Sequence, residues 1–368
     1  MKVKKKKLCV IVPAHWEKIM GGSQYQAKVL VDSLLQESRY EIYYLTSVLE
    51  PSFEPEGYKI IRVAERKGIR RYGYFFDSHK LSEILHQIKP DIIYQRVGCG
   101  WTGIAAHYAK KNNCNMVWHV AHDRTLLPFE RYISFDIAFR YLERKFLEFG
   151  IKNASRIVAQ TTWQKDQLSK QYGRDAVVIP NFHPQPQETI KKNNAFKIIW
   201  VANLKKWKRP DVFVQLARAF SNEQNIEFVM AGRNMLTPGE LDGLLTEIEE
   251  TPNLSYLGEC SQDKVNQLMA ESHIFVNTSQ YEGFANTFIQ AWMRRTAVVS
   301  YEVDPDELLS RSGNGLLASG DFELLKKQIM TLVKNDSKRE SLADKAYEYA
   351  MENHSVENVQ KLTNVLEA

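Results

Sequence analysis

One pattern repeats along the chain: a short apolar run with strand character, then a segment whose apolar residues recur at helical spacing. In the first half, the strand-like runs cover residues 8–14, 41–47, 58–64, 91–97, 114–121 and 155–161. In the second half, they cover residues 196–203, 226–232, 253–258, 273–279 and 296–303. Strands that alternate with helices predict an α/β fold built on doubly wound parallel sheets.

A polar segment divides this pattern into two parts. Residues 183–194, HPQPQETIKKNN, combine prolines, amides and charges without an apolar period, which is typical of a linker. A chain of 368 residues is long enough for two domains with a core each. We therefore expect a first domain over 1–182, a second over 195–350, and a C-terminal helix over 351–368. That helix is expected to pack through Val359, Leu362, Val365 and Leu366.

Charge is distributed unevenly between the two halves. Residues 1–182 carry 29 Lys and Arg against 18 Asp and Glu, whereas residues 183–368 carry 20 against 26. The positive excess predicts that the first half meets an anionic partner, which is either nucleic acid or the inner surface of a membrane.

Cysteine spacing and hydropathy indicate a protein that stays inside the cell. The four cysteines lie far apart, with no spacing suited to zinc or to a redox dithiol, so we expect reduced thiols and no metal site. The basic start, MKVKKKKLCVIVPAHW, lacks an apolar run long enough for a signal peptide. No later stretch approaches the length that spans a membrane, and we expect a cytoplasmic protein.

The clearest chemistry lies in the segment VNTSQYEGFANTFIQAWMRRTAVVS, which starts at Val276. It predicts a strand, a loop with Glu282 and Gly283, a helix that begins near Ala285, and another strand. This segment resembles glycosyltransferase family 4, of the bacterial polysaccharide and O-antigen type (group 1). Further segments that match the family follow in order along most of the chain: PAHWEKIMGG, DIIYQR, VIPNF, IWVANLKKWKRPD, FVMAGRN and YLGECSQD.

The resemblance implies the GT-B fold, two Rossmann-like domains with a cleft between them. The first domain would bind the acceptor and the second the nucleotide-sugar donor. Glu282 would contact hydroxyl groups of the donor sugar. The donor diphosphate would be held by backbone amides at a helix start, where free N–H groups favour anions: Gly283, Phe284, Ala285 and Asn286.

Gln290 departs from the family pattern, because most members have a second acid at this place. The resemblance puts this residue against the ribose diol of the nucleotide. An amide accepts at one atom only and makes weaker hydrogen bonds than a carboxylate, so we expect reduced nucleotide binding. The alternative is that Glu282 is merely a helix-start acid and Gln290 a surface residue.

A second departure lies in VANLKKWKRPD. The family has an Arg after the strand and a Lys before the next helix, and both neutralise the diphosphate of the leaving group. Lys208 matches the Lys, whereas Asn203 stands in place of the Arg. The missing charge is expected to come from Lys205, Lys206 or Arg233, and a solvated basic face is the alternative.

Two features of the first half complete the predicted site. Gly21 and Gly22 follow the first strand, where the family has an acceptor or phosphate loop, although paired glycines are also common in turns. His119 is the preferred match to a family histidine beside the donor sugar, with His122 a close second. For either position taken singly, a buried structural histidine is an equal alternative.

Basic and aromatic residues interleave in ERKGIRRYGYFFDSHK, which starts at Glu65. This mixture predicts contact with an anionic membrane surface through Arg66, Lys67, Arg70 and Arg71. Nucleic acid would use the same residues, but the resemblance favours the membrane. A plain surface loop is the third alternative.

The resemblance thus implies a retaining, metal-independent hexosyltransferase with His119, Glu282 and Lys208 as catalytic residues. Its substrate would be a UDP- or GDP-linked sugar, with no cofactor and no nucleic acid partner. Its acceptor would be a lipid-linked glycan in cell-surface polysaccharide assembly, at the inner face of the plasma membrane. The alternatives are a non-catalytic nucleotide-sugar binding module and an epimerase or phosphorylase of the GT-B fold.

Overall fold

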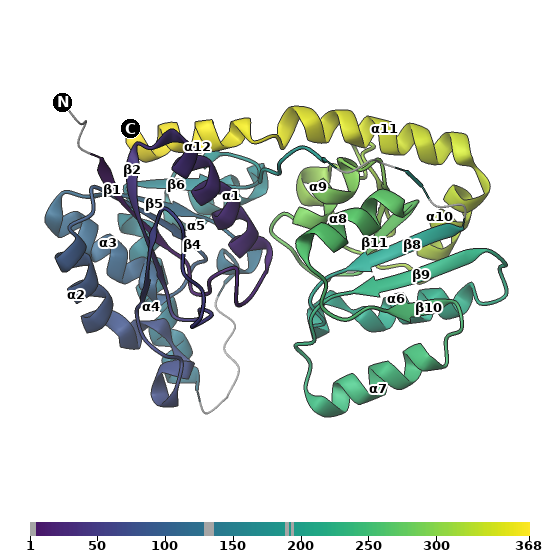
Figure 1. The fold of residues 1–368 in the computed structure, drawn as a ribbon, viewed down its shortest axis with the longest axis horizontal. Coiled ribbons are helices and arrows are strands. Elements are labelled where there is room, and N and C mark those ends of the chain that lie inside the picture. Colours follow the sequence, from purple (N-terminus) through teal and green to yellow (C-terminus); the bar gives the residue numbers. More distant parts are fainter. Residues whose placement is uncertain (1–4, 129–135, 188–190, 193–194) are drawn as a thin grey trace. The chain divides into compact units, whose positions relative to one another are not determined.

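The computed structural model describes residues 5–128, 136–187, 191–192 and 195–368. The chain forms two compact units, one of residues 1–182 and 356–368 and the other of residues 183–355. Each unit is a parallel sheet covered by helices (Figure 1). Residues 188–190 and 193–194 of the expected linker lie outside the described residues.

The described residues of the first unit contain one sheet of seven parallel strands, in the order β3-β2-β1-β4-β5-β6-β7. The direction of winding therefore reverses between β1 and β4, and ligands of such sheets bind beyond the carboxyl ends of the strands near this point. The strands are β1 (Lys6–Ile11), β2 (Tyr40–Thr46), β3 (Lys59–Arg62), β4 (Ile92–Arg96), β5 (Asn115–His119), β6 (Arg156–Ala159) and β7 (Val177–Val178).

Both faces of this sheet are buried. Cys9 and Ile11 of β1 point into one core, whereas Leu8 and Val10 point into the other, which is why the strand is apolar throughout. Side chains of α2 (Ser78–Ile88), α3 (Gly100–Asn112), α4 (Ile137–Asn153) and α5 (Thr162–Tyr172) fill the first core. Side chains of α1 (Gly22–Glu37) and α12 (Glu357–Glu367) fill the second.

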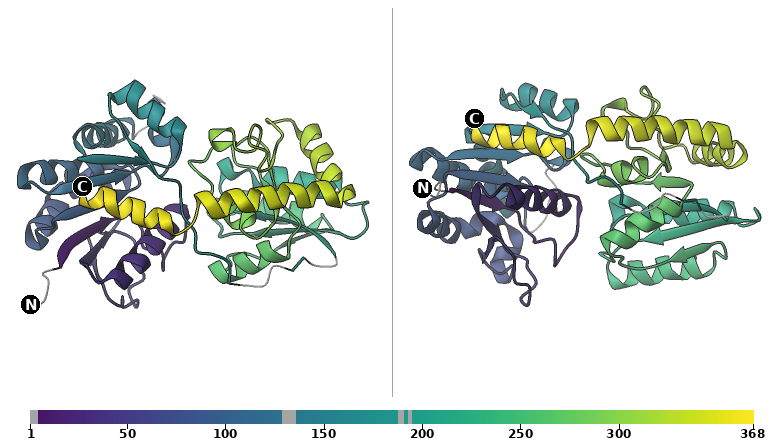
Figure 2. Two further views of the ribbon diagram at one scale, coloured as in Figure 1. Left: turned by 90° about the horizontal axis from the view of Figure 1, so that it is seen from above. Right: turned by 45° about the horizontal axis from the view of Figure 1, so that its top comes forward.

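The C-terminal segment expected to be one helix forms parts of two. Helix α11 ends at Asn353 in the second unit, and α12 begins at Glu357 and lies across the first unit (Figure 2). Val359, Leu362 and Leu366 are buried in the first unit, and Val365 is partly buried. The last turn is also tied to β1 by an ion pair between Lys6 and Glu367, with 3.0 Å between Nζ and Oε2.

The described residues of the second unit contain one sheet of six parallel strands, in the order β10-β9-β8-β11-β12-β13. The strands are β8 (Phe196–Val201), β9 (Ile226–Ala231), β10 (Leu254–Tyr256), β11 (Ile274–Asn277), β12 (Ala297–Ser300) and β13 (Leu316–Leu317). The helices are α6 (Pro210–Ala219), α7 (Pro238–Glu249), α8 (Gln262–Glu271), α9 (Asn286–Trp292), α10 (Phe322–Lys334) and α11 (Asp336–Asn353). Two apolar cores again lie on the two faces of the sheet.

The prediction of two Rossmann-like parallel sheets is confirmed. Each of the eleven strand-like runs in the sequence contains a strand, and the helix expected near Ala285 begins at Asn286. Strands β7 and β13 were not predicted, because two residues are too short to produce a pattern. Among the described residues, no helix is both long enough and apolar enough to cross a bilayer.

Helices α3 and α4 approach each other closely enough for their backbones to touch. A Cβ atom added at Gly103 would lie 2.2 Å from the carbonyl oxygen of Phe146, and one at Gly150 would lie 2.6 Å from the carbonyl carbon of Thr102. Only glycine leaves room for backbone at both positions, so these two residues set the distance between the helices.

Gly103→Ala should therefore lower the stability of the first unit by about 1 to 3 kcal/mol, the usual cost of overpacking. The measurement is the midpoint of thermal and denaturant unfolding. Gly243→Ala in α7 is the matched control, because nothing lies within 4 Å of its added Cβ and alanine favours the helix. Equal stability of Gly103→Ala and wild type would contradict the close approach of α3 and α4.

Candidate functional site

Two loops of the second unit are joined at the carboxyl edge of its sheet. One follows β8 and contains the turn Lys206–Lys208, and the other follows β11. The Gln280 N–H donates to the Trp207 carbonyl at 2.8 Å. The hydroxyl of Thr278 lies 2.6 Å from the Lys208 carbonyl oxygen and accepts from the Trp200 indole at 2.8 Å. These bonds hold the two loops in fixed register.

The joined loops bring Lys208 and Glu282 together as an ion pair. The carboxylate of Glu282 also accepts from the Ser279 hydroxyl at 2.8 Å. The side chains of Lys208 and Glu282 are only 19% and 11% exposed. Two residues that the sequence predicted to contact one donor therefore contact each other, in a place where charge is poorly screened by water.

Lys205 is the nearby cation that shares this environment. Burial lowers the pKa of Lys205, the charge of Lys208 lowers it further, and the carboxylate of Glu282 acts in the opposite direction. The ammonium group lies 4.9 Å from the centroid of the Trp207 ring. This indole in turn stacks on Tyr281, with 6.4 Å between ring centroids. Lys205 therefore lies near enough to Lys208 and Glu282 for its charge to act on both.

The other two candidate cations pair with different acids. Lys206 forms an ion pair with Glu240 at 2.5 Å, and Arg233 lies 3.9 Å from Glu259. Asn203 is half-buried at the end of β8. Of the three cations considered in the sequence, Lys205 is therefore the one placed beside Lys208 and Glu282.

Gln290 is buried in α9, and its side-chain amide donates to Asn266 Oδ1 of α8 at 2.9 Å. It is therefore not a surface residue. Phe284 is also buried, with its ring 4.8 Å from that of His354, and Ala285 has extended backbone before α9. Any ligand contact of Phe284 and Ala285 would come through the backbone, as the sequence led us to expect.

The structure places the two candidate histidines of the first unit differently. His119, at the end of β5, is wholly buried, and its Nδ1 accepts from Arg96 Nη1 at 2.9 Å. Burial, and then the charge of Arg96, hold the pKa of His119 well below its usual range, so its imidazole is neutral. His122 is half-buried, directly before the turn Asp123–Thr125. Of the two, His122 is the one that a ligand can reach.

Sequence reasoning missed the polar network around His119. The buried guanidinium of Arg96 lies 3.3 Å from the Tyr94 hydroxyl and donates to Asn181 Oδ1 at 2.8 Å. Asn181 Nδ2 donates to Gln160 at 3.1 Å, so the network joins the carboxyl ends of four strands or the loops after them. The available signal was a charged residue, Arg96, at the end of an apolar run.

Gly21 and Gly22 begin α1. Gly21 is the extended residue before the helix, and a Cβ added there would lie 2.8 Å from Gln24 Oε1. A side chain at Gly21 would therefore require the Gln24 side chain to move, and α1 begins directly after this residue, at Gly22.

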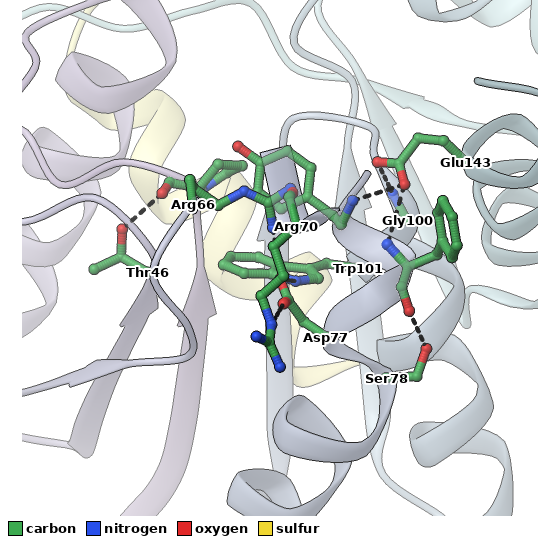
Figure 3. Close-up of polar contacts among 11 residues, drawn as sticks. Thr46, Arg66, Arg70, Asp77, Ser78, Gly100, Trp101 and Glu143 are labelled. Atoms are coloured by element: carbon green, nitrogen blue, oxygen red, sulfur yellow. Dashed lines mark hydrogen bonds and ion pairs between the residues drawn. The ribbon is translucent and has the colours of Figure 1, made fainter. Parts of the chain in front are cut away.

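The basic loop of residues 66–71 is folded onto a buried carboxylate (Figure 3). Asp77 Oδ2 accepts from Arg66 at 2.8 Å and from the Trp101 indole at 3.0 Å, and Oδ1 lies 3.3 Å from Arg70. Burial raises the pKa of Asp77, against which these partners act. Arg66 and Arg70 thus both have a buried partner, although the Arg66 side chain is 16% exposed and the Arg70 side chain is 49% exposed. Their contact with a membrane stays a prediction.

Lys67 and Arg71 lie on the outside of the same loop. The Lys67 side chain is 83% exposed and pairs with Glu65 on the surface. Arg71 lies over the ring of Tyr72 at 4.7 Å. Of the four basic residues predicted to face a membrane, Lys67, Arg70 and Arg71 are exposed and Arg66 is half-buried.

A second carboxylate anchors the loop from α4. Glu143 accepts backbone hydrogen bonds from Gly100 at 2.7 Å, Tyr74 at 2.8 Å and Phe75 at 3.1 Å (Figure 3). These three N–H groups have their acceptor in one side chain, so Glu143 joins α4 to the start of α3 and to the segment that follows the basic loop.

Sequence profiles of two known families match the chain. The profile described as Glycosyltransferase Family 4 matches residues 20–183, and the profile described as Glycosyl transferases group 1 matches residues 181–349. Together they extend over both units. The chain belongs to the group 1, family 4 glycosyltransferases. The resemblance seen in the sequence is thereby confirmed.

This family 4 glycosyltransferase is also similar to individual proteins. It is 23% identical to an uncharacterized glycosyltransferase of Methanocaldococcus jannaschii, over 93% of both chains. It is 32% identical to the lipopolysaccharide core biosynthesis glycosyltransferase LpsE of Rhizobium meliloti, over 24% of this chain and 26% of LpsE.

Solved structures share the fold of this family 4 glycosyltransferase. Anabaena HepE in complex with UDP and glucose superposes with a TM-score of 0.77 at 17% identity, over 98% of this chain and 99% of HepE. WaaG, a glycosyltransferase involved in lipopolysaccharide biosynthesis, superposes with a TM-score of 0.78 at 13% identity, over 98% of this chain and 99% of WaaG.

In the described part of the chain, no three His, Cys, Asp or Glu side chains converge as metal ligands.

Glu143→Ala should destabilise the first unit by roughly 2 to 5 kcal/mol, because it removes the acceptor of three backbone N–H groups. Thermal unfolding followed by circular dichroism measures the loss. Glu83→Ala is the matched control, since this glutamate of α2 pairs with Lys80 on the surface and such pairs contribute little. If the two variants unfold at the same temperature, Glu143 does not anchor the loop.

Proposed function

We propose that this chain is a retaining glycosyltransferase that moves a sugar from a UDP- or GDP-sugar to a lipid-linked glycan acceptor. The observation that carries the proposal is the convergence of Lys205, Lys208 and Glu282 at the carboxyl edge of the second sheet. Family membership supports it, as does the presence of UDP and UDP-glucose in solved HepE complexes of the same fold.

Each residue has a role that its surroundings allow. Lys208 and Lys205 would neutralise the diphosphate, whose negative charge increases as the sugar leaves. Glu282 would accept a hydrogen bond from a sugar hydroxyl, and the buried amide of Gln290 would contact the ribose. Because these groups belong to one joined pair of loops and the adjacent helix, their backbone positions would be set before a donor arrives.

Retention would follow from departure and attack on the same face of the sugar. The bond between the anomeric carbon and the diphosphate oxygen breaks, and the acceptor oxygen forms the new bond to that carbon. The acceptor proton moves to the departing phosphate oxygen, so the step needs no protein nucleophile. We assign the charge neutralisation to the two ammonium groups, which makes the proposed reaction independent of a metal.

On the side of the first unit, we assign the sugar-facing role to His122 rather than His119. His119 is enclosed by Arg96 and Tyr94, whereas His122 lies after the end of β5 in a half-buried position. Carboxyl ends of strands are where open α/β sheets bind ligands. His119 then acts as a neutral member of the buried network.

Lys208→Ala should lower the rate of sugar transfer about 100- to 1,000-fold, the cost of losing one preorganised contact to developing charge. The assay incubates the purified protein with radiolabelled nucleotide sugar and membrane extract, and NMR reads the anomeric configuration of the product. Lys206→Ala is the matched control, because Lys206 lies in the same turn but pairs with Glu240.

Normal transfer by folded Lys208→Ala would refute the assigned role. Binding of nucleotide sugar without transfer by the wild-type chain would instead favour a binding module, and release of a modified donor without acceptor would favour an epimerase. An inverted product would refute the same-face mechanism.

We further propose that the first unit contacts an anionic membrane surface at the inner face of the plasma membrane. Lys67 and Arg71 would supply the charge. An exposed apolar residue accompanies them, because Ile69 of the same turn is 53% exposed. Tyr72 of the turn stacks on Phe139 of α4, with 5.5 Å between ring centroids, which attaches the turn to this helix.

A double variant, Lys67→Gln with Arg71→Gln, should weaken binding to phosphatidylglycerol vesicles by about 2 kcal/mol, since each basic residue contributes about 1 kcal/mol. Sedimentation with vesicles measures binding. The control removes two charges at the other end of α3, Lys110→Gln with Lys111→Gln, and should bind as wild type does. Equal binding of both double variants would contradict the proposed surface.

A further inference from the structure

The ion pair in the second unit engages the ammonium group of Lys208, which the donor diphosphate would bind. Lys208 Nζ contacts Glu282 Oε1, and Lys205 lies close enough for its charge to act on both. A diphosphate that binds Lys208 competes with Glu282 for its ammonium group, and this inference rests on the proposed function.

Separation of Lys208 from Glu282 costs free energy, and the cost depends on which group replaces Lys208 at the carboxylate. The Glu282 side chain is 11% exposed, so its carboxylate regains little hydration when Lys208 turns to a phosphate. The Ser279 hydroxyl stays bonded at 2.8 Å, but a neutral hydroxyl compensates a charge less than an ammonium does. An incompletely compensated carboxylate of this kind opposes binding.

An intact nucleotide sugar and a free nucleoside diphosphate differ in how they meet this carboxylate. The sugar carries hydroxyl groups that can donate to Glu282 in place of Lys208. The free nucleotide has none there, and its terminal phosphate ionises a second time with a pKa near 6. At pH 7.5 it therefore adds a negative charge beside Glu282, which increases the repulsion.

We infer that Glu282 is a specificity-determining residue, which selects the intact nucleotide sugar over the free nucleoside diphosphate by exchanging Lys208 for hydroxyl groups of the sugar. The same exchange promotes release of the free nucleoside diphosphate after transfer, because Glu282 pairs with Lys208 again once the sugar has left.

The test is isothermal titration calorimetry of UDP and of UDP-glucose, without acceptor, into wild type, Glu282→Gln and Glu282→Ala. GDP and GDP-mannose replace them if the wild-type chain binds only guanine nucleotides. Glu302→Gln is the matched control, because Glu302 pairs with Arg209, the residue after Lys208, at 2.9 Å. Circular dichroism and thermal unfolding verify that each variant is folded.

Removal of the Glu282 charge should raise the affinity for the free nucleotide about tenfold, which is 1.4 kcal/mol, while affinity for the nucleotide sugar stays equal or falls. The preference for the sugar therefore shrinks in both Glu282 variants and persists in Glu302→Gln. Unchanged or weaker binding of the free nucleotide by the Glu282 variants would overturn the exchange.

Two outcomes separate this inference from the proposed function. If the wild-type chain binds neither type of ligand, the proposed function fails and the inference fails with it. If the wild-type chain binds and transfers, but the preference is the same in all variants, the inference alone fails. Loss of the fold in both Glu282 variants would identify the ion pair as structural, which also overturns the exchange.

Discussion

Both sheets consist of parallel strands buried on two faces, and this constraint decides where polar chemistry can lie. Each strand places alternate side chains into two apolar cores, so its middle has no room for an uncompensated charge. We therefore expect ionisable groups that meet a ligand to lie where strands end. The pair of Lys208 and Glu282 and the half-buried His122 all follow the carboxyl ends of strands.

The loops at these ends are not loose, because polar side chains tie them to the layer beneath. Thr278 and the Gln280 amide join two loops in the second unit. In the first unit, Glu143 accepts hydrogen bonds from three backbone N–H groups, and Asp77 forms ion pairs with two arginines. Such anchors make the positions of Lys208 and Glu282, or of Lys67 and Arg71, a property of the fold.

Charged residues in this chain therefore serve two purposes that look identical in the sequence. Arg66 and Arg70 pair with a buried acid, whereas Lys67, in the same short segment, pairs with Glu65 on the surface. Arg96 donates a hydrogen bond to His119 in the interior of the first unit. In the sequence, a histidine at the end of a strand looks the same as a residue that binds a ligand. Only the tertiary structure shows whether a charged residue binds a buried partner or is exposed to a ligand or a membrane.

The sequence by itself determined the element order, the two sheets and the family, because strand and helix periodicity and motif order are local properties. The resemblance carried by its motifs also predicted that Lys208, Glu282 and Gln290 belong to one donor site. Tertiary structure alone decided that Lys208 pairs with Glu282 and that α12 packs on the first unit. It also decided which candidate cation acts on this pair, namely Lys205 and not Lys206 or Arg233. It also decided that His119 is enclosed and that Asp77 occupies Arg66 and Arg70. The reason is the same in each case: burial and ion pairing depend on residues distant in the chain, and local patterns carry no information about distant partners.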